Sequence, residues 1–356
     1  MSALSSLHRR LATTGPDNLA EHLLFLSLCA VSFIYRAIVC VRLAAYRRRL
    51  LSAYRSRVPV VSVGNLTAGG TGKTPVVDLL LRWAESNAVR AAVVSRGYGG
   101  CPGSETLLVS DGDRLLVDNP SLCGDEPLLL ARRNPRAMIV VAPRRAAGVR
   151  LAEETGARLV ILDDGFQHLA VQRDLDVVLL DSQRPFGNHR LLPAGILREP
   201  VDHLSRADLV IMTRCESGGA SFPAFAGPVL YARHLLADNA VGLDGGSLQL
   251  ADLAGRPCVV FAGIAEPAGF FTALRKHGIT PVAELALDDH QVYSPAVINR
   301  LSSTVGDAEF YVTTEKDAVK LTSVALPLPC YRVPLEITIE PFTLFDRKLR
   351  QLLAKE

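Results

Sequence analysis

A glycine-rich stretch at residues 64–75, GNLTAGGTGKTP, contains the residue types of a phosphate-binding loop. It ends in the Gly-Lys-Thr of the pattern G-x-x-x-x-G-K-[ST]. In that pattern backbone N–H groups surround the phosphates, the lysine contacts the β- and γ-phosphates, and the hydroxyl binds Mg²⁺. The first glycine of the pattern is replaced by Thr67. The stretch is therefore either a variant nucleotide site or an ordinary glycine-rich turn.

The residues around this loop favour a nucleotide site. Residues 58–64 are β-branched and apolar, as in a buried parallel strand, and residues 75–83 have helical apolar spacing after a proline. A strand, a glycine-rich turn and a helix N-terminus supply the N–H groups and dipole that bind phosphate. Lys73 is the only lysine among the first 275 residues of an arginine-rich chain, which suggests that a compact ammonium is required there. The predicted nucleotide-binding residues are Thr67, Ala68, Gly69, Gly70, Thr71, Gly72, Lys73 and Thr74.

A second stretch, RLVILDDGFQH at residues 158–168, is an apolar strand that ends in two adjacent carboxylates. Such an acidic strand end holds Mg²⁺ in many nucleotide-binding proteins, directly or through water. The sequence DDG is also a common turn, but its combination with the upstream loop favours a metal site. We therefore predict that Asp163 and Asp164 serve a bound Mg²⁺.

Asp125 and His290 are candidates for proton transfer. Asp125 lies in CGDEP at the start of a predicted helix, where its carboxylate either caps the helix or takes a proton from an attacking hydroxyl. The residues alone leave both roles open. A lone histidine is more often structural than catalytic, although the acidic neighbours of His290 in DDH favour a functional role.

Three further polar loops are punctuated by glycine: SRGYGG at 95–100, RPFGN at 184–188 and LPAGILREP at 192–200. Loops of this kind suit the rim of a substrate site, and they also occur as ordinary surface turns. The sequence does not separate these two interpretations.

Apolar strands alternate with helical patterns from residue 58 to about residue 213, which predicts an α/β fold. We expect a P-loop NTPase-like parallel sheet with helices on both faces, and ligands at the carboxyl ends of its strands. A small, polar, glycine-rich run follows, and a second, smaller α/β unit begins beyond it. The predicted divisions are an N-terminal segment over residues 1–57, a kinase-like domain over 58–215, a linker over 216–223 and a second domain over 224–356.

The composition is that of a globular protein, with 49% apolar and 21% charged residues. A formal net charge of +3 is too small for general nucleic-acid binding, and no zinc knuckle or aromatic-basic motif is present, so we expect no nucleic-acid partner. The seven cysteines are scattered and never spaced as CxxC. This spacing indicates a reducing compartment with neither a disulfide framework nor a thiolate metal site.

The N-terminal segment carries a membrane pattern. Residues 22–35 are mostly apolar, and arginines follow at positions 36, 42, 47–49, 55 and 57. Fourteen residues are fewer than the roughly 20 that span a bilayer, and no small-residue cleavage site follows cleanly. We predict a membrane-associated helix at the interface, with the next domain in the cytoplasm. A buried core helix and a single span with Arg36 snorkelling are alternatives.

Taken together, the motifs resemble the tetraacyldisaccharide 4'-kinase family of lipid A biosynthesis. The matching stretches occur in order from residue 58 to about residue 320: SVGNLTAGGTGKTP, SRGYGG, GDEP, DDGFQH, RPFGN, LPAGILREP, AGIAEP, DDH and TTEKDAVK. The apolar N-terminal segment also fits, because that family takes a lipid from the inner membrane. The chain departs from the family at Leu287-Asp288, where an aromatic residue and proline are usual.

The resemblance implies an ATP- and Mg²⁺-dependent kinase that phosphorylates the 4'-hydroxyl of tetraacyldisaccharide 1-phosphate and yields lipid IVA. It implies location at the cytoplasmic face of the inner membrane of a Gram-negative bacterium, with no obligate protein partner. In the matching motifs Lys73 and Thr74 act on phosphates and Mg²⁺, and Asp125 is the base with His290 as its partner. The resemblance further implies Glu199 near the metal, and the residues near substrate and phosphates are Tyr98, Glu126, Gln167, His168 and Arg198.

Three other functions compete with this interpretation. A membrane-associated partition-type ATPase also has a GGxGKT loop, but it usually carries a lysine where this chain has Ala68. A GTPase is disfavoured because TEKD at residues 314–317 lacks the order of the guanine-binding motif. A soluble small-molecule kinase leaves the apolar N-terminus unexplained.

Overall fold

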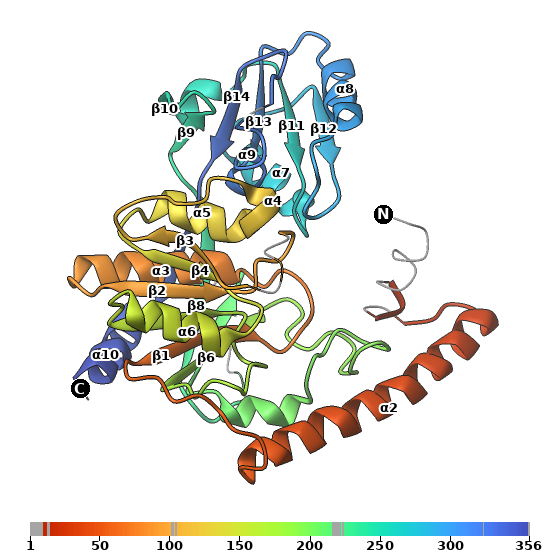
Figure 1. The fold of residues 1–356 in the computed structure, drawn as a ribbon. Helices are drawn as coiled ribbons and strands as arrows, with labels where there is room; N and C mark the ends of the chain where they lie inside the picture. The colour runs from red at the N-terminus through yellow and green to blue at the C-terminus, as the bar shows by residue number, and fades with distance from the viewer. Residues whose placement is uncertain are drawn as a thin grey trace.

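The computed structural model describes residues 10–12, 15–100, 103, 105–215, 222, 224–322 and 324–354. Two β-sheets form two bodies, one above the other in Figure 1, and a long N-terminal helix lies beside the lower body. The linker expected over residues 216–223 falls, except for Phe222, outside the described part of the chain.

The lower body is built on a nine-stranded sheet. The edge strands β15 and β3 run antiparallel to their neighbours, and the strands between them are parallel. In spatial order the strands are β15 (Leu335–Glu340), β8 (Val229–Leu236), β7 (Leu209–Thr213), β6 (Leu175–Asp181), β1 (Val60–Asn65), β5 (Leu159–Asp163), β2 (Ala91–Ser95), β4 (Met138–Val141) and β3 (Leu107–Asp111). The predicted parallel sheet is confirmed, with the strand that precedes the phosphate loop at its centre.

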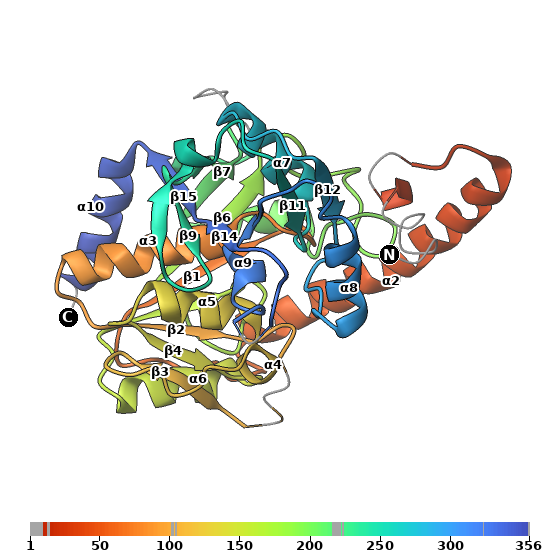
Figure 2. The ribbon, with the colours of Figure 1, turned by 90° about the horizontal axis from the view of Figure 1, so that it is seen from above.

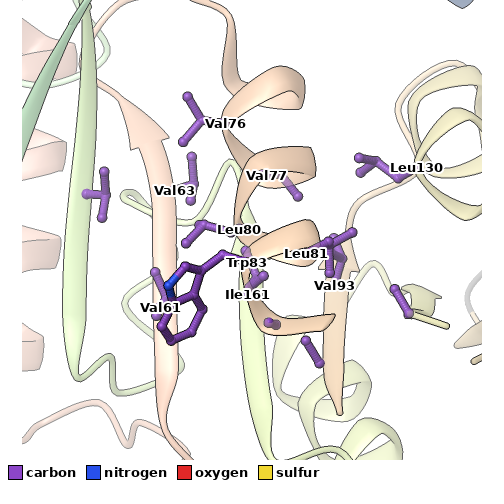
Figure 3. Close-up of a cluster of buried hydrophobic side chains, with 14 of the residues drawn as sticks. Val61, Val63, Val76, Val77, Leu80, Leu81, Trp83, Val93, Leu130 and Ile161 are labelled. Carbon is purple, nitrogen blue, oxygen red and sulfur yellow. The ribbon is translucent and has the colours of Figure 1, made fainter. Parts of the chain in front are cut away.

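Helices cover both faces of this sheet because successive side chains of the central strand β1 point into different cores. All residues of β1 are buried. Val61 and Val63 pack with the helices α3 (Lys73–Ser86), α5 (Asp125–Arg133) and α10 (Phe342–Leu353), whereas Val60 belongs to the core under α6 (Arg145–Glu154). Figure 3 shows Leu80 and Trp83 of α3 beside Val63 and Val61. Each buried side chain of this size contributes about 1.5–3 kcal/mol, so this contact fixes the two elements that flank the phosphate loop.

The upper body contains a six-stranded sheet. Its strands, in spatial order, are β10 (Ser247–Gln249), β9 (Asn239–Gly242), β14 (Cys330–Val333), β13 (Phe310–Thr314), β11 (Cys258–Ala262) and β12 (Ala283–Ala286). The helix α7 (Pro267–Lys276) covers one face, and α8 (Pro295–Ser303) covers the other. A short helix, α9 (Glu315–Ala318), follows β13 and contacts α5 of the lower body.

The predicted domain boundary at residue 224 is wrong. The strands β8 and β15 and the helix α10 belong to the nine-stranded sheet, so the upper body extends only from β9 to β14. In β15 only Ile337 and Ile339 are buried, and they pack into the core beneath α10. An alternating pattern of this kind predicts an edge strand but does not tell which sheet it joins. That choice is made by tertiary packing.

The N-terminal helix α2 (Leu19–Arg47) has 29 residues and continues through Arg36. It is long and apolar enough to cross a membrane. The fourteen-residue apolar stretch counted in the sequence therefore underestimated the length of this helix. Only 6% of its apolar window is buried, which contradicts the alternative of a core helix. Seen from above (Figure 2), α2 and α10 lie on opposite sides of the molecule. The helix is fastened near its middle, where the Ser32 hydroxyl donates to the Leu191 carbonyl at 2.9 Å.

Candidate active site

The predicted phosphate loop connects β1 to α3. Gly69 and Gly72 have φ values of +117° and +80°, which residues with a Cβ rarely adopt. Asn65, at the end of β1, donates from Nδ2 to the Thr71 hydroxyl at 3.0 Å and stabilises the turn from within. Because Gly72 precedes α3 and has no side chain, no cap covers the first N–H groups of that helix. These groups and the helix dipole form an anion site.

Lys73 and Arg198 meet at Asp164. The Lys73 ammonium lies 3.4 Å from Asp164 Oδ1, and Arg198 Nη1 lies 2.8 and 2.7 Å from the two carboxylate oxygens. Burial opposes ionisation of Asp164, but the two cations outweigh it and hold its pKa below the usual range. Asp164 is therefore an ionised carboxylate that keeps both cations beside the phosphate loop.

Asp163 has a different environment. It is 5% exposed and accepts a hydrogen bond from the Ser95 hydroxyl at 3.1 Å. Burial, together with the nearby charge of Glu126, raises the pKa of its carboxyl to about 6. A divalent cation bound nearby would offset the cost of ionising this buried carboxylate.

Glu199, expected near the metal, has two close hydrogen-bond partners in this structure. Its Oε2 accepts hydrogen bonds from His203 Nδ1 and Arg206 Nη2, both at 2.8 Å, and its side chain is buried. Arg206 also stacks on the ring of Phe166, with its guanidinium carbon 4.2 Å from the ring centre. These contacts hold Glu199 Oε2 in place, and a role near the metal stays a prediction for this residue.

Asp125 and His290 come together across the two bodies. His290 Nδ1 lies 3.1 and 3.0 Å from the two carboxylate oxygens of Asp125. Gly124, and not Asp125, is the N-cap residue of α5, and Asp125 Oδ1 accepts the N–H of the adjacent Glu126. Capping of the helix is therefore not the main role of Asp125. His290 reaches Asp125 although the residues before it depart from the family pattern.

Opposite charges stabilise each other in this pair. Burial disfavours the charged form of Asp125, but the hydrogen bond from His290 and the charge of Lys316 outweigh it and lower its pKa. The hydrogen bond to Asp125 raises the pKa of His290 and outweighs the effect of its burial. Gly99 leaves open space beside the pair, because a Cβ there would lie 3.4 Å from His290 Nδ1 and 3.9 Å from Asp125 Oδ1.

We expect His290 to titrate above its reference pKa of 6.5 and to return toward that value in Asp125→Asn. The stability that this pair contributes is then complete below pH 6.5 and is lost as the pH rises through the folded-state pKa of His290. Nitrogen-15 NMR of the imidazole rings against pH measures both values. An identical His290 pKa in the parent and the variant would contradict the pairing.

A cleft of about 1640 Å³ joins these parts. It extends from the middle of α2, past the phosphate loop, to His290 and α7 of the upper body. Of the predicted site residues, Thr67 and Asp125 do not line it: Thr67 pairs with Leu197, and Asp125 is 4% exposed. The other predicted residues line this cleft, namely Ala68, Gly69, Gly70, Thr71, Gly72, Lys73, Thr74, Tyr98, Glu126, Asp163, Asp164, Gln167, His168, Arg198, Glu199 and His290.

Several of the residues expected near substrate have specific surroundings. The ring of Tyr98 lies 5.0 Å from that of His290, and Glu126 forms an ion pair with Lys316 at 3.2 Å. Burial lowers the pKa of His168 to about 4, so its imidazole is neutral at pH 7. Gln167 donates from Nε2 to the Asn65 carbonyl at 2.9 Å, which connects the acidic strand end to the phosphate loop.

Sequence reasoning missed Arg214, which connects the phosphate loop to both bodies. Its guanidinium donates to the Gly70 carbonyl at 2.8 Å and forms ion pairs with Asp181 and Glu266 at 2.6 and 2.8 Å. Its φ of +60° is unusual for a residue with a side chain. Its position directly after a predicted strand was the only sign of a role in the sequence.

Comparisons with known proteins agree on one family. A family model described as tetraacyldisaccharide-1-P 4'-kinase matches residues 24–354. A tetraacyldisaccharide 4'-kinase of Syntrophotalea carbinolica is 47% identical over the full length of both chains, and that of Geobacter sulfurreducens is 44% identical over 92% of this chain and 94% of its own. The crystal structure of LpxK from Aquifex aeolicus in complex with ATP is 30% identical, with a TM-score of 0.79 over 93% of this chain and 99% of that chain. This chain therefore belongs to the tetraacyldisaccharide 4'-kinase family.

Proposed function

We propose that this chain transfers the γ-phosphate of ATP to the 4'-hydroxyl of tetraacyldisaccharide 1-phosphate and forms lipid IVA. Family membership supports this reaction, with 47% identity over the whole chain. The observation that carries the proposal is the single cleft that is lined by the phosphate loop, by His290 and by the membrane-type helix α2. A lipid acceptor and a nucleotide donor would meet in it.

Positioning and charge compensation supply most of the catalysis in such a reaction. The loop from Ala68 to Gly72 and the N-terminus of α3 hold the phosphates. Lys73 leaves its 3.4 Å contact with Asp164 and moves to the transferring phosphoryl group. Asp164 remains paired with Arg198 at 2.7 Å, so the departure of Lys73 leaves no isolated charge.

Asp125 accepts the proton of the acceptor hydroxyl. A new bond forms between the 4'-oxygen and the γ-phosphorus, the bond from that phosphorus to the bridging oxygen breaks, and ADP leaves. The proton goes to an Asp125 oxygen, and Gly99, which has no side chain, lies beside the pair. His290 holds the carboxylate in position from 3.0 Å and comes from the upper body, so closure of the two bodies completes the site.

The residues near the phosphate loop fit Mg²⁺. Thr74, Asp163 and Asp164 offer hard oxygen ligands, and a bound cation would offset the burial that raises the pKa of Asp163. Within the described chain no group of three or more His, Cys, Asp or Glu side chains forms a closed metal cage. This suits a cation that retains water and phosphate oxygens as ligands. When bound, Mg²⁺ would offset negative charge on the phosphates.

Asp163→Asn is expected to weaken metal binding in the presence of nucleotide by at least about 10–100-fold. In the parent, metal affinity should fall as the pH decreases below about 6, because the Asp163 carboxyl becomes protonated there. Binding of Mn²⁺ followed by electron paramagnetic resonance measures both effects, and addition of EDTA should abolish phosphoryl transfer. Equal Mn²⁺ affinity of the parent and the variant would show that Asp163 is not a ligand of the metal.

The chain associates with the cytoplasmic face of the inner membrane through α2. Supporting this, the helix exposes large apolar side chains along its length, and Arg47, Arg48 and Arg49 follow them. The most exposed of these apolar residues are Leu19, Leu23, Leu26, Phe33, Ile34, Ile38 and Val41.

Flotation with phosphatidylethanolamine and phosphatidylglycerol vesicles tests this association. The double substitution Phe33→Ser and Ile34→Ser should reduce vesicle binding, because both side chains are exposed on α2. The matched control is Val282→Ser with Val292→Ser, which removes two exposed apolar side chains from the upper body. Equal binding of both variants would exclude α2 as the attachment.

The kinase activity is tested with γ-labelled ATP, Mg²⁺ and tetraacyldisaccharide 1-phosphate in detergent. Label should move to the lipid, and ATP consumption should depend on the lipid. Release of the label as inorganic phosphate, at a rate independent of lipid, would refute the kinase and support a membrane ATPase.

A further inference from the structure

The motif TTEKDAVK at residues 313–320 contains a lysine that the reaction above leaves without a role. Lys320 lies in the turn after α9, and its side chain is only 11% exposed. Its ammonium lies between two buried carboxylates, 3.1 Å from Asp317 Oδ1 and 3.7 Å from Asp125 Oδ2. It also lies 5.4 Å from the ring centre of Tyr293. A buried ammonium is retained only where paired charges offset its desolvation.

Asp317 anchors this lysine to the upper body. It is fully buried, and its Oδ2 accepts hydrogen bonds from the Gly263 N–H at 2.9 Å and from the Thr314 hydroxyl at 2.7 Å. A Cβ on Gly263 would lie 2.9 Å from Asp317 Oδ1, so the strand β11 and this carboxylate fit closely. With one oxygen fixed by the backbone, the other is directed at Lys320. The contact with Asp317 therefore gives the lysine a defined position in this structure.

The charges that face the Asp125–His290 pair come from four segments. Lys316 of α9 lies 3.3 Å from His290 Nε2, and it also contacts Asp289 and Glu126 at 3.1 and 3.2 Å. Asp289 and Glu126 thus share the charge of Lys316, which still acts on Asp125 and His290. Lys320 contacts Asp125 directly, and its other carboxylate partner, Asp317, is engaged by two further donors.

The pair can hold its proton in two ways that differ in reactivity. With His290 neutral, Nδ1–H donates to Asp125 and the carboxylate can accept a substrate proton. With His290 protonated, the imidazolium stabilises the Asp125 charge and makes that carboxylate a weaker base. A fixed cation at Asp125 Oδ2 disfavours the second form because it repels the imidazolium, although, like the imidazolium, it also weakens Asp125 as a base.

We propose that Lys320, held by Asp317, is a positioning residue that keeps the Asp125–His290 pair in the form able to accept the substrate proton. This inference rests on the proposed function. It gives the TTEKDAVK motif a role beyond packing. The ability of Asp125 to accept a proton then depends on contact between the two bodies.

The experiment compares the parent with Lys320→Met and Lys320→Arg. Without the cation, the acid limb of kcat and the pKa of His290 by nitrogen-15 NMR should both move up by about one pH unit. At pH 7 kcat should fall about 10-fold and recover as the pH rises, whereas the KM for ATP should stay within about two-fold. Lys320→Arg keeps the charge and should restore most of the kcat. Lys348→Met, on α10, is the matched control and should leave the profile unchanged.

A merely structural role for Lys320 predicts the opposite sign. If the lysine only supports packing, its loss loosens the pair, and the His290 pKa falls toward 6.5 while kcat falls equally at every pH. Either result would overturn the proposal. If thermal melting shows that Lys320→Met does not fold, Lys320→Gln, with a similar length and no charge, takes its place with the same expected shifts. Failure of the proposed function is separate, since it would appear as absent lipid phosphorylation by the parent itself.

Discussion

Replacing Asp125 by asparagine is expected to lower kcat for lipid phosphorylation by about 10²–10⁴-fold, the usual contribution of a general base. The amide has nearly the same shape as the carboxylate and can still accept a hydrogen bond from His290, which lies 3.0 Å from Asp125 Oδ2 in the parent. What it loses is the ability to take a proton. The KM for ATP should stay within about three-fold, because Asp125 lies apart from the residues that line the phosphate loop.

Single-turnover transfer of label from γ-labelled ATP to the lipid measures this rate without interference from product release. Asp118→Asn is the matched control, because Asp118 is an exposed carboxylate paired with Arg132 at 2.6 Å, and its loss should not change the rate. A variant that retains more than about a tenth of the parent rate would show that the proton goes elsewhere. If the ATP affinity of the variant fell by the same factor as its transfer rate, Asp125 would instead contribute to nucleotide binding.

The lower body was predictable because its strands are buried on both faces and therefore appear in the sequence as short apolar runs. The carboxyl ends of the parallel strands β1 and β5 carry the phosphate loop and the two aspartates. Local chemistry sufficed there, since each motif directly follows its own strand.

The arrangement of distant segments was not predictable in the same way. The strand β15 pairs where its buried side chains can pack into the core beneath α10. The helix α2 continues through Arg36, which a count of consecutive apolar residues does not predict. The resemblance placed Glu199 near the metal, but its motif alone did not show which residues hold its side chain. Its actual partners, His203 and Arg206, occur four and seven residues later along the chain.

The pairing of Asp125 with His290 shows the limit most clearly. These residues are 165 positions apart, and no spacing rule joins them. Family resemblance suggested the pair, but the lysines around it became interpretable only with coordinates. Lys320 contacts Asp125 because Asp317 and β11 direct it there, and the sequence TTEKDAVK contains no sign of that target.

Lys73→Met is expected to reduce kcat for phosphoryl transfer by about 10²–10³-fold, comparable with the loss of one preorganised donor at developing charge. ATP binding should weaken as well, because in the proposed reaction the ammonium contacts the phosphates before and during transfer. Lys73→Arg should not restore activity, because a planar guanidinium does not fit where a compact ammonium follows Gly72. Transfer kinetics and binding of a fluorescent ATP analogue measure the two effects.

The fold should tolerate this substitution, which makes the test decisive. Lys73 and Asp164 are 16% and 34% exposed at their side chains, and Arg198 keeps Asp164 paired at 2.7 Å when the lysine is removed. A melting temperature close to that of the parent is therefore expected, with Lys348→Met on α10 as the matched control. A folded Lys73→Met variant with normal transfer would mean that Arg198, released from Asp164, supplies the charge at the phosphates. The double variant with Arg198→Met would then lose the activity that the single variant had kept.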